Sequence, residues 1–238
     1  MQQQRSGTND GTSTRANHLF PSEETRLQKT VRKGFQGLVT VIVGASKKEF
    51  TVHKDLLSFY SDYFRAAFNG SFVEATDKKI ELHDVKPEVF DNFHAWLYMR
   101  KLADEKDEPL SWNHLIELWI FGDRFQVPML QNCVMDEMSA KLRHSHGFRI
   151  GWLKIAYENT VDGSPLRKVM IEYIAYNVSL GEDDESIMTA ENRQWYTVEI
   201  LQDLIKELDF ARKNKVSHNK WPKRDKCFFH VHGKDEHC

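Results

Sequence analysis

The stretch FTVHKDLLSFYSDYFRAAFNG, residues 50–70, changes its hydrophobic period partway along. Phe50 and Val52 alternate with polar residues, as in a half-buried strand. Apolar residues then recur at helical spacing, at Leu56, Leu57, Tyr60, Phe64, Ala67 and Phe68. Ser61 interrupts this pattern and is predicted to cap a second helix, because its hydroxyl can accept a backbone N–H. Asn69-Gly70 is predicted to end that helix in the left-handed conformation, so the stretch predicts a strand followed by two short helices.

The polar side chains of this stretch could be interpreted as a catalytic site, but their spacing does not favour that interpretation. His53 and Asp55 could form a general-base pair. Asp55, however, falls in the first helical turn, where its side chain would point elsewhere and where the helix dipole favours negative charge. We expect His53 to end the strand and to hydrogen-bond to backbone. Because GxxxxGK[ST], GxGxxG, HExxH and GxSxG motifs are also missing, we predict a non-enzymatic protein without catalytic residues.

Strands and helices alternate on both sides of residues 50–70. The β-branched run LVTVIVG, residues 38–44, is predicted to form a hairpin with EFTVH, and KIEL at 79–82 a short strand. Helices are predicted from Pro87 and on both sides of Val127-Pro128, since the residue before proline avoids the α region. Further helices are predicted within residues 148–160, within 164–180 with Ser164 as N-cap, and around Leu201, Leu204, Ile205 and Leu208.

The composition is that of a globular protein without a strong overall charge. Its 238 residues are 40% hydrophobic, which is enough for one sizeable core. Lys and Arg number 33 against 35 Asp and Glu, so no whole-chain field favours nucleic acid or an anionic membrane. Residues 1–30 are polar and aperiodic, which predicts a disordered arm without a signal peptide. With three cysteines, too few for a disulfide framework, we expect an intracellular protein of the nucleus or cytoplasm, with no membrane segment.

The C-terminal tail, residues 211–238, is basic and rich in Cys and His. Zn²⁺ prefers four nitrogen or sulfur ligands in a tetrahedron. The tail offers five candidates, namely Cys227, His230, His232, His237 and Cys238. Because His237 and Cys238 are adjacent, one of them is predicted to bind together with Cys227 and either His230 or His232. We predict no cofactor other than this zinc, and the alternatives are a disordered tail or a closing strand formed by FFHV.

The same tail carries cations of the kind that contact phosphates. They are Arg212, Lys213, Lys215, Lys220, Lys223, Arg224 and Lys226, with Trp221 among them. Asp225, Asp235 and Glu236 dilute this charge, so nucleic acid is not the favoured partner. The cluster supports an alternative function, that of a nuclear transcription- or chromatin-associated protein that uses its basic tail.

The succession of these elements resembles a BTB/POZ domain over about residues 35–143. The most specific part is the string His53-Lys54-x-x-Leu57-x-x-x-Ser61-x-x-Phe64-x-x-x-Phe68. The resemblance implies an α+β fold, in which a small β-sheet packs on helical hairpins, followed here by a C-terminal helical extension. SPLRK at 164–168 and the Cys/His-rich end are similar to small stand-alone fungal BTB proteins. The predicted division is an arm at 1–30, a BTB/POZ domain at 31–143, the helical extension at 144–210 and the tail at 211–238.

The resemblance also implies a function in protein–protein interaction. Members of the family self-associate or hold partner proteins, and several are substrate adaptors that dock on the cullin scaffold of a ubiquitin ligase. Cullin-binding adaptors share a hydrophobic-x-Glu triplet after the helix that is predicted to end near Asn69, and this chain has Phe72-Val73-Glu74 there. An exposed aromatic beside an acid could act as an anchor with a polar rim, whereas the alternative is that Phe72 packs under the loop. We predict that Ser71, Phe72, Val73 and Glu74 bind a partner protein.

One departure from the family pattern bears on self-association. Many self-associating relatives carry Asp just before the first strand, where it lines a charged pocket at the dimer interface. Here Leu38 takes that place, and residues 1–30 show no long amphipathic helix of the kind that such relatives exchange. We therefore predict a monomer or a weak dimer at micromolar concentration.

Overall fold

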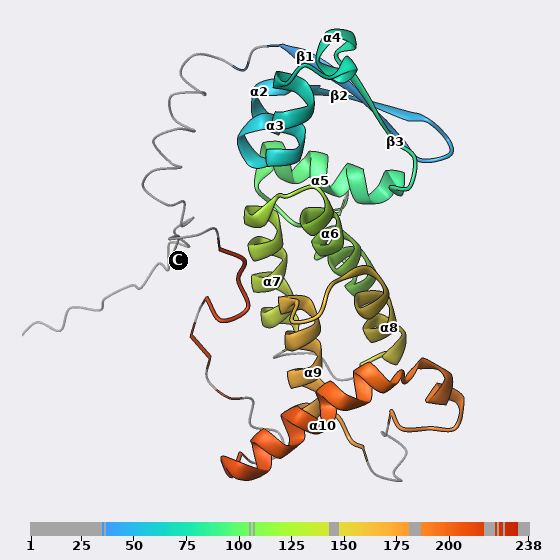
Figure 1. The fold of residues 1–238 in the computed structure, drawn as a ribbon, viewed down its shortest axis with the longest axis vertical. Helices are drawn as coiled ribbons and strands as arrows, with labels where there is room; N and C mark the ends of the chain where they lie inside the picture. The colour runs from blue at the N-terminus through green and yellow to red at the C-terminus, as the bar shows by residue number, and fades with distance from the viewer. Residues whose placement is uncertain are drawn as a thin grey trace, which may run out of the picture.

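The computed structural model in Figure 1 describes most of the chain between residues 35 and 232. The described residues are 35, 37–104, 106, 108–142, 148–180, 187–216, 222, 224–225 and 227–232. The predicted arm at 1–30 lies outside them. No helix within these ranges is long and apolar enough to cross a lipid bilayer.

A three-stranded sheet lies at one end of the molecule (Figure 1). The predicted hairpin is confirmed, with β1 (Leu38–Val43) antiparallel to β2 (Lys48–His53). The predicted strand at 79–82 is also confirmed, as β3 (Lys79–Leu82), and it pairs parallel to β1 with Lys79 opposite Thr40. The strand order is β2-β1-β3, so the most apolar strand, β1, takes the central position.

Two short helices follow β2 directly, as the opening stretch predicts. They are α2 (Lys54–Tyr60) and α3 (Asp62–Asn69), separated by Ser61. The predicted cap is confirmed, because Ser61 Oγ accepts a hydrogen bond from the Phe64 N–H at 3.0 Å. The same hydroxyl donates to the Phe125 carbonyl at 2.6 Å, so a fully buried cap also ties α3 to a distant helix end.

The prediction of a left-handed end for α3 is wrong. Gly70 has φ −83° and ψ −165°, an extended conformation that any residue can adopt. Position 70 requires glycine because there is no room for a side chain. A Cβ atom here would lie 2.6 Å from the Ala66 carbonyl oxygen. A side chain at this position would force the end of α3 to shift.

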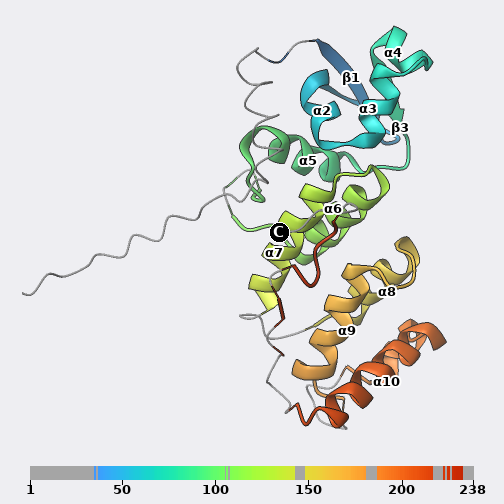
Figure 2. The same ribbon diagram turned by 60° about the vertical axis from the view of Figure 1, so that its left-hand side comes forward.

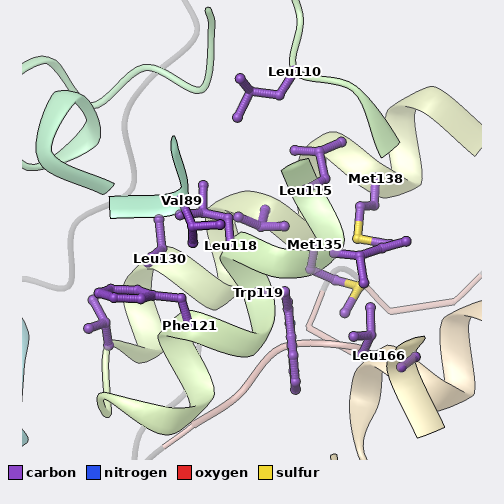
Figure 3. Close-up of a cluster of buried hydrophobic side chains, with 14 of the residues drawn as sticks. Val89, Leu110, Leu115, Leu118, Trp119, Phe121, Leu130, Met135, Met138 and Leu166 are labelled. Carbon is purple, nitrogen blue, oxygen red and sulfur yellow. The ribbon is translucent and has the colours of Figure 1, made fainter. Parts of the chain in front are cut away.

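Three longer helices follow, and the first of them packs on the sheet and on α3 through contacts of Phe90 with Phe50 and of Phe93 with Phe64. They are α5 (Pro87–Met99), α6 (Trp112–Arg124) and α7 (Pro128–Leu142), with the break at Val127 where it is predicted. Their core is aromatic, and the buried ring of Phe64 lies near Phe68, Phe93 and Phe125, with ring centroids 5.6 to 6.4 Å apart. Figure 3 shows the side chains of Leu118, Trp119 and Phe121 of α6 within the larger cluster of buried hydrophobic residues.

The C-terminal helices extend this core rather than forming a separate one. They are α8 (Ile150–Asn159), α9 (Pro165–Asn177), the 3₁₀ turn η1 (Glu191–Trp195) and α10 (Val198–Lys213). Leu166 of α9 points towards Trp119 and Met135 in Figure 3, within the same buried cluster.

Two details of these helices differ from the predictions. Ser164 is the N-cap residue of α9, as predicted, and Pro165 takes the first helical position, but the Ser164 side chain makes no capping hydrogen bond within the described structure. Of the apolar residues predicted to mark α10, Leu204 is buried while Ile205 is 64% exposed. The helical spacing of apolar residues predicted α10 correctly. The apolar residues of α10 cover a wider face than the one that packs on α9, so Ile205 is left exposed.

Candidate functional site

The predicted partner-binding residues form an exposed corner of the domain. The short helix α4 (Val73–Asp77) follows α3, and Figure 1 shows it beside the sheet at the outer end of the molecule. Phe72 is 60% exposed and Val73 is 65% exposed, while Glu74 is half-buried. Phe72 therefore does not pack under the loop, and no residue of α4 is buried.

The backbone around Gly70 explains why Phe72 is presented in this way. Phe72 is the N-cap of α4, in an extended conformation, and its carbonyl accepts a hydrogen bond from the Ala75 N–H at 3.1 Å. A Cβ at Gly70 would lie 3.1 Å from the Phe72 ring as well as against Ala66. The missing side chain thus lets the aromatic ring lie close to the backbone at the end of α3, in a fixed position on the surface.

The opening His53 has a structural partner that the sequence did not indicate. Its ring Nδ1 lies 2.9 Å from the Tyr98 hydroxyl, and its backbone N–H donates to the same oxygen at 3.2 Å. The expectation of a hydrogen bond to backbone is wrong for the His53 side chain, which contacts the Tyr98 hydroxyl near the end of α5 instead. Asp55 lies in the first turn of α2, as predicted. This arrangement joins β2 to α5.

The structure brings together three of the five predicted metal ligands. One ligand atom each of Cys227, His230 and His232 lies within 4.8 Å of the others. All three residues are half-buried. His237 and Cys238 fall outside the described residues.

The basic cluster of the tail is partly engaged in ion pairs within the protein. Arg212 and Lys213 both contact Asp209, at 2.6 and 2.5 Å. Arg224 binds both carboxylate oxygens of Glu172 on α9, at 2.7 and 3.1 Å. Lys220, Trp221, Lys223 and Lys226 lie outside the described residues. Arg224 is thus neutralised by Glu172, whereas Arg212 and Lys213 share the single negative charge of Asp209. The charge left for a phosphate-binding surface is reduced.

A cleft that the sequence did not indicate lies between α6, α8 and the start of α5. It encloses about 330 Å³, with apolar walls that include Val89, Phe121 and Ile155. The Lys86–Glu117 ion pair, at 2.6 Å, lies at this cleft. Its walls come from segments up to 75 residues apart, from Asp84 to Asn159, so no local pattern could have predicted it.

Comparison with known proteins assigns the N-terminal part of the chain. The family model described as BTB/POZ domain matches residues 28–142. Kelch-like protein 40 of Xenopus laevis is 26% identical over 143 residues, a match that covers 56% of this chain and 22% of that protein. BTB/POZ domain-containing protein 17 of Mus musculus is 24% identical over 214 residues, covering 87% of this chain and 40% of that protein. The chain therefore spans less than half the length of these relatives.

Solved structures also match about half of the chain. The BTB domain of human gigaxonin aligns with a TM-score of 0.35 and 16% identity, covering 56% of this chain and 97% of that one. The resemblance to stand-alone fungal proteins is not tested by these matches and stays a prediction.

Proposed function

We propose that this chain, whose residues 28–142 match the family model described as BTB/POZ domain, is a non-enzymatic adaptor or scaffold that binds other proteins through Ser71–Glu74. The observation that carries the proposal is the exposure of Phe72 and Val73, at 60% and 65%, on a helix that buries nothing of its own. Phe72 and Val73 are adjacent exposed apolar residues next to the carboxylate of Glu74. Binding hot spots have this composition, in which an apolar centre is surrounded by polar groups.

The proposed partner is the N-terminal domain of a cullin scaffold in a ubiquitin ligase. Supporting this choice are the hydrophobic-x-Glu triplet at 72–74 and the similarity to Kelch-like protein 40. Phe72 would fill an apolar pocket of the partner, and Glu74, in the first turn of α4, would accept hydrogen bonds at its edge. The triplet lies far from α8–α10, which leaves the other end of the molecule for a client (Figure 1).

A double substitution tests this surface. Phe72→Ala with Glu74→Ala is expected to weaken binding to a purified cullin N-terminal domain at least about tenfold, because truncating a hot-spot residue costs about 2 kcal/mol or more. Calorimetric titration of the full chain measures the affinity. A matched control is Val198→Ala with Glu191→Ala, an exposed apolar and an exposed acidic residue near α10, which should change the affinity less than twofold. Equal affinities for both double variants would remove residues 72–74 from the interface.

The oligomeric state bears on how such an adaptor would assemble. We propose that the chain is a monomer or a weak dimer, since Leu38, which is 54% exposed, stands where self-associating relatives carry an acid. Light scattering at micromolar concentration should give a mass near 27.9 kDa. A stable mass of twice that value would contradict the proposal.

A further inference from the structure

The C-terminal tail returns to the helical body and is held there by specific contacts. Asn132 of α7 accepts the Val231 N–H at 2.7 Å and donates to the Val231 carbonyl at 3.0 Å. Phe229 is 8% exposed. In both Figures 1 and 2 the red segment of the tail runs beside α7. The side chains around residue 230 therefore lie on a fixed support rather than on a free end.

The local backbone of the tail gathers its Cys and His side chains. The His230 N–H donates to the Cys227 carbonyl at 3.0 Å, which closes a turn and brings residues 227 and 230 together. The Cys227 N–H is held in turn by Asp225 Oδ1 at 3.0 Å. His232 lies two residues beyond His230, and side chains two apart in extended chain share a face. The turn and the extended segment thus bring one cysteine and two histidine side chains to one place.

The resulting distances are close to those of a tetrahedral metal site. The three ligand atoms lie within 4.8 Å of one another. Bonds of about 2.3 Å to sulfur and about 2.0–2.1 Å to nitrogen place tetrahedral ligands roughly 3.3 to 3.7 Å apart. A closure of about 1 Å, within the reach of side-chain rotation, would therefore complete the arrangement.

A carboxylate on α7 provides the orienting contact that metal-binding histidines usually have. His230 Nε2 lies 2.9 Å from Asp136 Oδ1, and the His230 side chain is only 7% exposed. A carboxylate at one ring nitrogen of a metal-binding histidine fixes the tautomer and the orientation of the ring. Because Asp136 is almost a hundred residues from the tail, this contact exists only in the folded chain.

From these contacts we propose that Cys227, His230 and His232 of the reduced chain bind one zinc-class divalent ion, with Asp136 as a positioning residue. Cys227 is disulfide-bonded in this structure, and a disulfide sulfur is not a thiolate ligand. Reduction by an external thiol transfers two electrons and two protons and yields two thiols. The Cys227 thiol then loses its proton when the metal binds. Under oxidising conditions the tail would be constrained by the disulfide bond of Cys227, and under reducing conditions by metal coordination. This change would not involve the Phe72 surface.

Cobalt binding tests the proposal directly. The full chain, prepared without a histidine tag and reduced, is titrated with Co²⁺ and then with Zn²⁺ as competitor. We expect one equivalent of Co²⁺ with a thiolate-to-cobalt charge-transfer band, which Zn²⁺ displaces. Cys227→Ser should abolish the band, while Cys133→Ser, which removes the free cysteine on α7, should leave it unchanged. The oxidised chain should show no band.

The histidine and carboxylate variants separate direct ligands from support. His230→Gln and His232→Gln should each weaken Zn²⁺ binding at least about tenfold, and Asp136→Asn about tenfold through the orientation of His230. His114→Gln, at the start of α6 and outside the proposed ligand set, should have no effect. Unchanged far-ultraviolet circular dichroism would show that the variants still fold. The proposal is overturned by a reduced chain without the charge-transfer band, by a band that survives Cys227→Ser, or by Zn²⁺ affinity that neither histidine variant changes.

Discussion

Replacing Phe64 by alanine is expected to lower the free energy of unfolding by about 4 kcal/mol. The ring is fully buried, and it stacks near Phe93 and Phe125 at centroid distances of 6.3 and 5.6 Å. These partners come from α5 and from the end of α6, so they cannot all close on the space that the ring would leave. Urea unfolding of the full chain measures the loss, which corresponds to roughly 10 °C in Tm.

Phe72→Ala provides the matched control for that experiment. It makes the same chemical change eight residues along the chain, at a ring that is 60% exposed, and should cost less than about 0.5 kcal/mol. If the two variants lost similar stability, then Phe72 would be part of the core and the assignment of the 71–74 surface would fail. A large difference, with cullin binding lost only in the Phe72 variant, would separate the scaffold of the domain from its contact surface.

Patterns confined to a few neighbouring residues predicted much of the fold. The alternation at Phe50 and Val52, the cap at Ser61 and the proline at position 87 depend on local backbone chemistry, and the structure confirms each of them. The triplet at 72–74 could be selected only because the family resemblance supplied a reason to look there. Its exposure depends on how α3 ends, which the sequence did not indicate correctly.

The features of the structure that the sequence did not predict are contacts between residues far apart in the chain. The parallel pairing of β3 with β1 and the contact of His53 with Tyr98 join segments some 40 residues apart. Asp136 meets His230 across 94 residues. No periodicity encodes such contacts, because they follow from the packing of whole helices. The Cys/His spacing of the tail was visible, but its support on α7 was not.

Replacing Arg224 by methionine is expected to release the C-terminal tail from the helical body. The Arg224 guanidinium binds both oxygens of Glu172, whose side chain is 5% exposed, and it also lies over the Phe228 ring at 4.5 Å. Removing one partner of a buried ion pair typically costs 3–5 kcal/mol. Here the chain can limit that cost, because undocking the tail would return the Glu172 carboxylate to water. The loss should therefore be about 2 kcal/mol and should affect the tail rather than global unfolding.

Chymotrypsin measures this release, because it cleaves after aromatic residues and Phe229 is buried when the tail is docked. A loss of about 2 kcal/mol should raise the rate of cleavage at the Phe229–His230 bond roughly 30-fold, as followed by intact mass. Arg124→Met, which removes an arginine from an exposed pair with Asp84, should leave the rate unchanged. Arg224→Met with Glu172→Met should restore much of the protection, since an apolar pair can replace a buried ion pair. Cleavage at the wild-type rate in Arg224→Met would mean that Asn132 and Asp136 hold the tail on their own, and that the ion pair with Glu172 contributes nothing to docking.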